Sequence, residues 1–493
     1  MNDTPLNSSG NLQPEDNKIT HSDFISESER LLKLFEPAKH DQILDSLLNQ
    51  LTPVDFRLLT GIEDESEKLS LKHYLICTIE QILQLAKKNN CEMCFHQDKI
   101  YLYNGAYWKQ IDEPRLQSFL GSAALKLGVN RFNADYYQFQ DHLIKQFFAT
   151  ANLQFPEPNS DAVLINIING TFQISLTGQF IRDPQAADFL TYQLPFAYDP
   201  TANAPMFIKY LNKVLPDKKC QMILAEYLGY LFIRPAALKL EKALILYGSG
   251  ANGKSVFSDI VNALLGKENV CSFSLQNLTD DKGYHRAMIS NKLVNYTSEI
   301  NGKMDTSYWK QLVSGEPVDA RLPYGSPFTM TNYAKLIFNC NELPQEVEHT
   351  NAYFRRFLLI PFEVMIPIHE QDKELSKKII ANELPGVFNW VFDGLKRLLR
   401  EKQFTSSETV DNQLERYKKE SDSVLMFLQE EEYEKSTDRH MKVKELYPLY
   451  KAYCSENGYR PCSNKKFCER MKNAGYTVER KNFGNAIYVQ KTL

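Results

Sequence analysis

The stretch LILYGSGANGKSVF, residues 244–257, decides the fold of the central part of the chain. It contains the pattern G-x-x-x-x-G-K-S at Gly248, Gly253, Lys254 and Ser255. The apolar run ALILY before the pattern is typical of a short buried strand, and VFSDIVNALLG after it carries apolar residues at helical spacing. The stretch therefore predicts a glycine-rich loop that joins a strand to a helix.

The residue types in this loop point to phosphate chemistry. A loop that opens a helix directs backbone N–H groups and the positive end of the helix dipole at one place. Glycines let the backbone approach phosphate oxygens, the lysine would contact the β- and γ-phosphates, and the serine hydroxyl would bind Mg²⁺. We therefore predict an ATP site with Mg²⁺. Its residues, called here the glycine-lysine loop, are Gly248, Ser249, Gly250, Ala251, Asn252, Gly253, Lys254 and Ser255.

Two later apolar runs end in polar side chains. NKLVNYTSEI, residues 291–300, predicts a strand that ends at Glu299, a carboxylate that could hold Mg²⁺ and polarise an attacking water. AKLIFNCNELP, residues 334–344, predicts a strand that ends at Asn341, which could orient the water, with Asn339 as the alternative. Their order along the chain favours a nucleotide-hydrolysing site over a chance glycine loop.

An arginine pair and a predicted hairpin complete this region. AYFRRFLLIPF places Arg355 and Arg356 before another apolar strand, where an arginine could stabilise charge on a γ-phosphate held by a neighbouring subunit. Taken alone, each arginine is better explained as a surface ion pair. Glycines and prolines punctuate residues 309–330, which predicts a helix end followed by a protruding hairpin.

Together these motifs resemble superfamily 3 helicases of the phage, plasmid and poxvirus primase-helicase type. The resemblance rests on GSGANGKS, LVNYTSE, KQLVSGEPVDARLPYGSPF, LIFNCNELP and FRRFLLIPF, with YNGAYWK and NIINGTFQI upstream and LYPLYKAYCSENGYRPCSNKKFCERMKNAGY downstream. It implies an α/β fold: a P-loop AAA+-like core with an α+β N-terminal domain and a C-terminal winged helix.

The resemblance also implies roles and partners. It implies a homo-hexameric ring that hydrolyses ATP between subunits and moves on single-stranded and forked DNA, with Glu299 as base and Asn341 as polar sensor. Arg356 is ranked ahead of Arg355 as the arginine donated to the neighbouring subunit. Arg321 and Tyr324 of the hairpin would contact DNA in the pore. Many relatives carry a lysine just after that tyrosine, and this chain has Gly325 instead.

The resemblance also bears on primase activity, because relatives with that activity carry a catalytic domain with paired metal-binding acids before the accessory domain. Only about 80 residues precede the accessory domain here, and they look helical. No primase activity is therefore expected in this chain, and a separate primase would act alongside it. The alternative is an ATP-regulated assembly that binds or loads at an origin without unwinding. A small-molecule kinase is a third reading, and it leaves the hairpin and the arginine pair without a role.

Changes in hydrophobic pattern and clusters of turn-forming residues divide the chain into five segments. The pairs Asn104-Gly105 and Asn169-Gly170 signal hairpins within the expected accessory domain. The expected segments are a flexible tail at 1–23, a helical region at 24–90, an α+β accessory domain at 91–200, the helicase core at 206–400 and the winged helix at 421–493.

The last segment is basic. Residues 436–493 hold twelve Lys and Arg against five Asp and Glu. A helix at about 464–474 is expected to present four cations outward to a DNA groove, and a structural or protein-binding domain is the alternative. These cations are Lys465, Lys466, Arg470 and Lys472.

Composition limits the remaining possibilities. The 493 residues carry a net charge of −4 and are 43% hydrophobic, so DNA contact must come from local patches and not from overall charge. No apolar run approaches the roughly 18 residues that cross a membrane, and the polar N-terminus lacks a signal-peptide core. We expect no membrane partner and a cytoplasmic protein of a bacterial or phage-infected cell.

Overall fold

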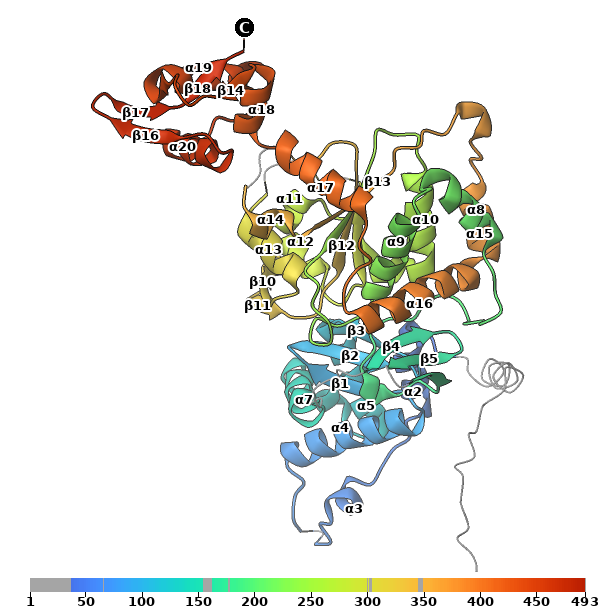
Figure 1. Cartoon of the computed structure of the whole chain (residues 1–493). Helices are drawn as coiled ribbons and strands as arrows, with labels where there is room; N and C mark the ends of the chain where they lie inside the picture. The colour runs from blue at the N-terminus through green and yellow to red at the C-terminus, as the bar shows by residue number, and fades with distance from the viewer. Residues whose placement is uncertain are drawn as a thin grey trace, which may run out of the picture.

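The computed structural model describes residues 37–64, 66–153, 162–175, 178–298, 300, 304–344 and 349–492. The chain forms a mixed α/β structure with an N-terminal part, a central sheet covered by helices, and a C-terminal part that projects from the central one (Figure 1). The expected tail at 1–23, the first residues of the expected helical region (24–36) and Glu299 lie outside the described residues.

A five-stranded sheet forms the middle layer of the central part. Its order is β13-β7-β12-β9-β8 and every neighbouring pair is parallel. Side chains of β7 alternate between its two faces: Leu244 and Leu246 join one hydrophobic cluster, and Ala243 and Ile245 join another. Both faces therefore need helical cover. The strands are β7 (Ala243–Tyr247), β8 (Val270–Cys271), β9 (Val294–Thr297), β12 (Lys335–Cys340) and β13 (Phe357–Pro361).

Helices cover both faces of this sheet. On the Leu244 face lie α8 (Pro205–Val214), α9 (Lys218–Tyr230), α10 (Lys254–Leu265), α15 (Leu375–Asn382) and α16 (Leu384–Glu401). On the Ile245 face lie α11 (Leu275–Leu278), α12 (Tyr284–Met288), α13 (Thr306–Ser314), α14 (Asn351–Phe354) and α17 (Glu408–Glu420). Single 3₁₀ turns occur at η2 (Lys267–Asn269) and η3 (Ile368–Glu370).

Helix α17 extends the central part beyond the expected end of the core at residue 400. The Tyr417 ring packs 5.7 Å from the Phe357 ring, and its hydroxyl donates to the backbone oxygen of Pro344 at 2.8 Å. The polar stretch after residue 401 therefore buries one face of a helix against β13.

The N-terminal part has one core built from helices and a small sheet. Apolar side chains of its helices pack with those of the antiparallel sheet β1-β2-β3. The helices are α2 (His40–Gln50), α3 (Phe56–Thr60), α4 (Leu71–Lys88), α5 (Glu113–Leu127), α6 (Arg131–Ala134) and α7 (Tyr137–Thr150). The strands are β1 (Met93–His96), β2 (Lys99–Tyr103) and β3 (Trp108–Ile111), with the predicted Asn104-Gly105 turn between the last two.

A second antiparallel sheet, β4-β5-β6, packs on the central part. Its residues Ile165 and Phe172 belong to the same hydrophobic cluster as α16, and the rings of Phe172 and Phe392 lie 4.8 Å apart. Side-chain packing thus joins residues 162–198 to the core, while the division at residue 200 stays a prediction. The elements are β4 (Ala162–Ile167), β5 (Gly170–Ser175), β6 (Gly178–Arg182) and the 3₁₀ turn η1 (Ala186–Asp188).

The C-terminal part has its own hydrophobic cluster, in which Phe427, Tyr450 and Phe467 are buried. It combines three helices with two small antiparallel sheets, β15-β17-β16 and β14-β18. Its elements are α18 (Ser423–Glu430), β14 (Tyr433–Lys435), β15 (Met441–Lys442), α19 (Val443–Glu456), α20 (Asn464–Asn473), β16 (Val478–Lys481), β17 (Gly484–Ile487) and β18 (Val489–Lys491). Within the described ranges, no helix is both long and apolar enough to cross a membrane.

Candidate functional site

The glycine-lysine loop connects β7 to α10 at the carboxyl end of the central sheet. Lys254 opens α10 and turns back into the loop, where its ammonium donates to the backbone oxygen of Gly248 at 2.7 Å and to Asn252 Oδ1 at 3.0 Å. The residue is only 6% exposed, and burial lowers the pKa of its ammonium below the ordinary value. The loop therefore holds a buried cation over the ends of the strands.

Two glycines make this loop geometry possible. A Cβ atom at Gly248 would lie 2.2 Å from the backbone oxygen of Phe362 and 2.3 Å from Asn252 Nδ2. Gly253 has φ 85°, and a Cβ there would lie 2.8 Å from Val214 Cγ1. Larger residues would displace the loop at both positions. By contrast, a Cβ at Gly250 would meet no atom within 4 Å, so the loop is open on that side.

The third predicted strand end lies beside the lysine. Asn341 follows β12 directly, is exposed, and places its Oδ1 3.4 Å from the Lys254 ammonium. Its competitor Asn339 is buried and accepts a 3.0 Å hydrogen bond from the Tyr296 hydroxyl. Ser255 is exposed in the first turn of α10. The structure thus brings Lys254 and Asn341 together, and Glu299 lies outside the described residues.

Two contacts that hold the loop were not anticipated from the sequence. The Tyr210 hydroxyl of α8 donates to the backbone oxygen of Gly253 at 2.8 Å, and burial raises the pKa of Tyr210 well above its ordinary value, so the hydroxyl keeps its proton. Asn252 Nδ2 donates to the backbone oxygen of Phe362 at 2.7 Å. Neither partner lies near the motif in sequence, so spacing alone carries no signal for them.

The arginine pair lies at the opposite end of the sheet from the loop. Phe357, the residue after Arg356, pairs with Ala243 at the amino end of β7. The five residues of β7 rise about 3.3 Å each, which puts about 16 Å between the two ends. Neither arginine can therefore reach the loop of its own chain.

The two arginines have different surroundings. The Arg356 side chain is 8% exposed, donates to Ser314 Oγ at 2.9 Å and to the backbone oxygen of Ala352, and lies 3.4 Å from the Glu241 carboxylate. The Arg355 side chain is 56% exposed and its ion pair with Glu241 measures 2.7 Å. The structure thus presents Arg355 to the outside, although the sequence ranked Arg356 first.

The predicted hairpin is present as β10 (Val318–Arg321) and β11 (Pro327–Met330). Tyr324 forms its tip with φ 61° and is fully exposed. Arg321 is exposed, and its Nε donates to the backbone oxygen of Gly325 at 2.9 Å across the turn. The hairpin precedes β12, so it also belongs to the amino end of the sheet.

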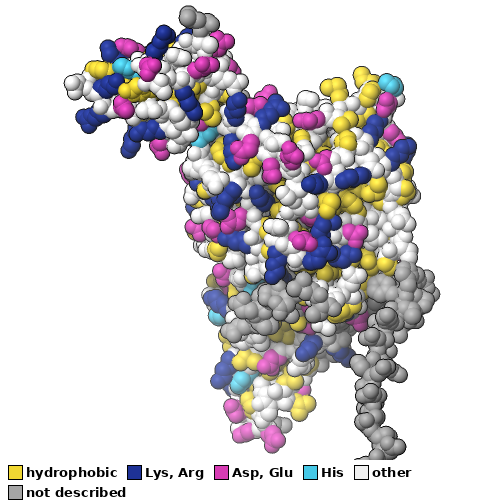
Figure 2. Space-filling view, in the orientation of Figure 1, with side chains coloured by type: hydrophobic (Ala, Val, Ile, Leu, Met, Phe, Trp, Pro, Cys, Tyr) yellow, Lys and Arg dark blue, Asp and Glu magenta, His cyan; other side chains and the backbone are white. Residues whose placement is uncertain are grey.

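Three of the four predicted cations of α20 are exposed: Lys465, Lys466 and Lys472. The expectation that Arg470 faces outward with them is wrong. Its side chain is 19% exposed and pairs with the Asp422 carboxylate at 3.3 Å, because α20 packs against the start of α18. Figure 2 shows basic side chains in dark blue on the C-terminal part, at the upper left, interspersed with acidic ones in magenta.

Three family models match successive stretches of the chain. Residues 81–216 match "D5 N terminal like", residues 246–356 match a family of unknown function, DUF5906, and residues 419–491 match "Poxvirus D5 protein-like". The middle match includes the glycine-lysine loop, the hairpin and the arginine pair.

Two viral proteins, both named "Putative helicase", are similar to parts of the chain. One, from Acanthamoeba polyphaga mimivirus, is 27% identical over 203 residues, which cover 38% of this chain and 20% of that protein. The other, from Invertebrate iridescent virus 3, is 23% identical over 367 residues, which cover 64% of this chain and 38% of that protein. The chain therefore spans well under half the length of these relatives.

Among solved structures, the apo form of the NrS-1 C-terminal region matches with a TM-score of 0.48 and 15% identity, and the match covers 83% of this chain and 98% of that one. The chain is a mixed α/β protein in which matches to D5-type families flank the central sheet. The chain is thus similar to D5-type proteins on both sides of its central part, and to viral proteins named as helicases.

Proposed function

We propose that this protein is an ATP-hydrolysing DNA helicase with a P-loop core of the superfamily 3, AAA+-like type. One observation carries the proposal: Lys254 lies within 3.4 Å of Asn341, in a loop where a larger residue at Gly248 or Gly253 would displace the backbone. A buried cation and a strand-end amide at the carboxyl edge of a parallel sheet form the arrangement expected for binding a triphosphate. The viral relatives named as helicases support the same conclusion.

The residues divide the work of hydrolysis between them. Backbone N–H groups of the glycine-lysine loop and Lys254 bind the β- and γ-phosphates, for which the lysine leaves the backbone oxygen of Gly248. Asn341 and Glu299 hold the attacking water, and Glu299 accepts its proton. Mg²⁺, when bound, neutralises charge on the phosphates, and Ser255 and Glu299 are the residues that would hold it.

The remaining cation comes from a neighbouring subunit. Because the arginine pair lies about 16 Å from the loop of its own chain, completing the site requires a second copy, which we propose to be the next subunit of a hexameric ring. Arg355 is the better candidate. Its exposed ion pair with Glu241 is worth at most about 1 kcal/mol, so it can be exchanged for a phosphate.

DNA is contacted at two places in this proposal. The fully exposed Tyr324 at the hairpin tip can stack on bases of a single strand, with Arg321 beside it for the phosphates. The C-terminal part acts as a winged helix whose α20 presents Lys465, Lys466 and Lys472 to a duplex.

Strand displacement on a forked duplex tests the function. We expect ATP-dependent release of the labelled strand, DNA-stimulated phosphate production, and loss of both in Lys254→Ala. ATP-dependent DNA binding without displacement would instead support an origin-binding or loading assembly. A rate of ATP hydrolysis that does not change when DNA is added would contradict both the helicase and the loading assembly.

A further inference from the structure

A cavity of about 480 Å³ lies between the β4-β5-β6 sheet and the central part. One wall comes from β4 and residues 187–192, and the other from residues 231–237 with the segments just before β9 and β12. These segments mark the amino ends of the strands, so the cavity is at the other end of the sheet from the glycine-lysine loop. Its volume falls in the range of pockets that hold small molecules.

The charges of the cavity are unbalanced. Four basic side chains and one acidic one line it: Arg182, Arg234, Lys292, Lys335 and Asp188. The acid is already paired, since Arg182 and Asp188 form a 2.6 Å ion pair whose side chains are 21% and 10% exposed. The other three cations therefore have no carboxylate lining the cavity to balance them.

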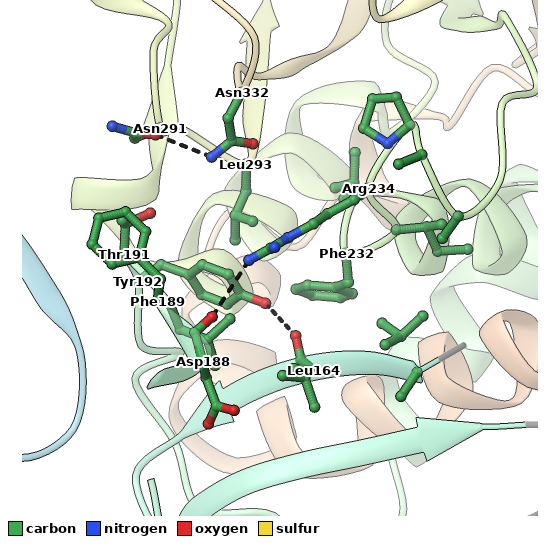
Figure 3. A pocket seen from close by; sticks show the side chains of 18 of the residues that line it. Leu164, Asp188, Phe189, Thr191, Tyr192, Phe232, Arg234, Asn291, Leu293 and Asn332 are labelled. Carbon is green, nitrogen blue, oxygen red and sulfur yellow. Dashed lines mark hydrogen bonds between the residues drawn. The ribbon is translucent and has the colours of Figure 1, made fainter. Parts of the chain in front are cut away.

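Arg234 is the cation best placed to receive a ligand. Its guanidinium reaches across the cavity toward the backbone oxygen of Asp188 (Figure 3), but that contact is long, at 3.5 Å. A guanidinium carries five N–H donors in a flat fork that matches a phosphate or carboxylate. The weak existing contact would be given up at little cost.

Lys335 is a second cation without a counter-charge. Its ammonium donates to the backbone oxygen of Ile233 at 2.6 Å and lies 4.4 Å from the centre of the Tyr230 ring, and no ion pair to it is found among the described residues. Burial lowers the pKa of this ammonium to about 7. An anion bound nearby would restore the charged form.

The rest of the lining suits a flat heterocycle. The rings of Phe189, Tyr192 and Phe232 line the cavity together with Leu293. On another side stands an amide pair, in which Asn332 Nδ2 donates to Asn291 Oδ1 at 3.0 Å (Figure 3). Aromatic walls beside amides and cations combine stacking, hydrogen-bond readout of a base edge and binding of a phosphate.

We propose that this cavity is a second nucleotide site, which binds a nucleoside monophosphate moiety with its phosphate on Arg234 and its base between the aromatic wall and the asparagine pair. The moiety is either a free mononucleotide or the phosphorylated end of a DNA strand. Asn332 and Asn291 lie at the base of the hairpin, because the Asn291 N–H donates to the Asn332 backbone oxygen at 3.0 Å. A bound nucleotide would therefore touch the element proposed to contact DNA.

Equilibrium binding of AMP to the full chain tests the proposal. We expect saturable binding that weakens at least about tenfold in Arg234→Ala. Binding should recover in part in Arg234→Lys, which keeps the positive charge but lacks the planar guanidinium that can donate two hydrogen bonds to one phosphate. The matched control is Arg400→Ala, an arginine whose side chain is 73% exposed on α16, and it should bind like the unaltered chain. Binding lost in Lys254→Ala but kept in Arg234→Ala would place AMP in the glycine-lysine loop and overturn the proposal.

Competitors and a direct map complete the test. Inorganic phosphate that competes as well as AMP would reduce the cavity to an anion site and refute the nucleoside part. A 5′-phosphorylated oligonucleotide that competes where its unphosphorylated form does not would identify a strand end as the source. Photocrosslinking with 8-azido-AMP on the unaltered chain should label peptides containing residues 187–192 or 231–237. Labelling of neither peptide, or no saturable binding at millimolar AMP, would overturn the site without affecting the proposed helicase function.

Discussion

The two ends of the central sheet differ in how their cations are held. At the carboxyl end, Lys254 is buried in a loop packed so closely that a Cβ at Gly248 would lie 2.2 Å from a backbone oxygen. At the amino end, Arg355, Tyr324 and Arg234 are exposed and weakly held. One end is therefore organised within a single chain, while the other leaves its functional groups exposed.

The largest expected effect comes from removing the exposed arginine. Arg355→Ala should lower ATP turnover about a thousandfold or more in the assembled protein, because an arginine supplied to a γ-phosphate stabilises charge that develops in the transition state. Stability should hardly change, since an ion pair this exposed contributes at most about 1 kcal/mol. Steady-state phosphate release and thermal unfolding measure the two quantities.

Mixing experiments distinguish a neighbour's site from the chain's own. Subunits carrying Lys254→Ala supply intact arginines, and subunits carrying Arg355→Ala supply intact loops, so mixtures should regain part of the lost turnover. Mixtures that stay inactive at every ratio would contradict the proposal that Arg355 acts on the ATP site of a neighbouring subunit.

Removing the buried cation should have the next largest effect. Lys254→Ala should reduce turnover by about 10² to 10³, the range found when one preorganised donor to a reacting group is lost. Lys396→Ala, which removes a lysine whose side chain is 45% exposed on α16, is the control and should keep normal turnover. If Lys254→Ala hydrolysed ATP as fast as the control, the glycine-lysine loop would have no role in hydrolysis.

The hairpin tip should affect DNA affinity and not stability. Tyr324→Ala should weaken binding of a single strand about tenfold, because stacking of one base on an aromatic ring is worth about 1 to 3 kcal/mol. Its side chain is fully exposed, so the unfolding temperature should stay the same. Fluorescence anisotropy with a labelled oligonucleotide measures the affinity. An unchanged affinity would leave the hairpin without a DNA contact.

The carboxyl end was largely predictable because its signals are local. The spacing of Gly248, Gly253 and Lys254 predicts a strand–loop–helix, and parallel strands that end in polar residues must bring those ends together, which anticipates the contact with Asn341. The two hairpins at Asn104-Gly105 and Asn169-Gly170 followed from the same kind of local pattern.

The amino end was less predictable because partners from distant segments decide it. Adjacent arginines look equivalent in sequence, and both reach Glu241, more than 100 positions earlier. Arg356 differs in that it also donates to Ser314, 42 positions before it. Arg470 was misplaced for the same reason, since Asp422 lies 48 positions away. The cavity that we propose as a nucleotide site is lined by residues from four distant stretches of sequence, so no local motif predicts it.

The smallest expected effect on catalysis separates the two neighbouring arginines. Arg356→Met keeps most of the buried volume but removes the bonds to Ser314 and Ala352, so it should lower the free energy of unfolding by roughly 1 to 3 kcal/mol. Turnover per folded assembly should fall only a few-fold, because Glu241 and the loops around it shift while Arg355 remains. Denaturant unfolding and active-site-normalised turnover measure these quantities. A stable Arg356→Met protein with a thousandfold loss of turnover, beside an Arg355→Ala protein of normal rate, would reverse the assignment and make the buried arginine the one that the neighbour receives.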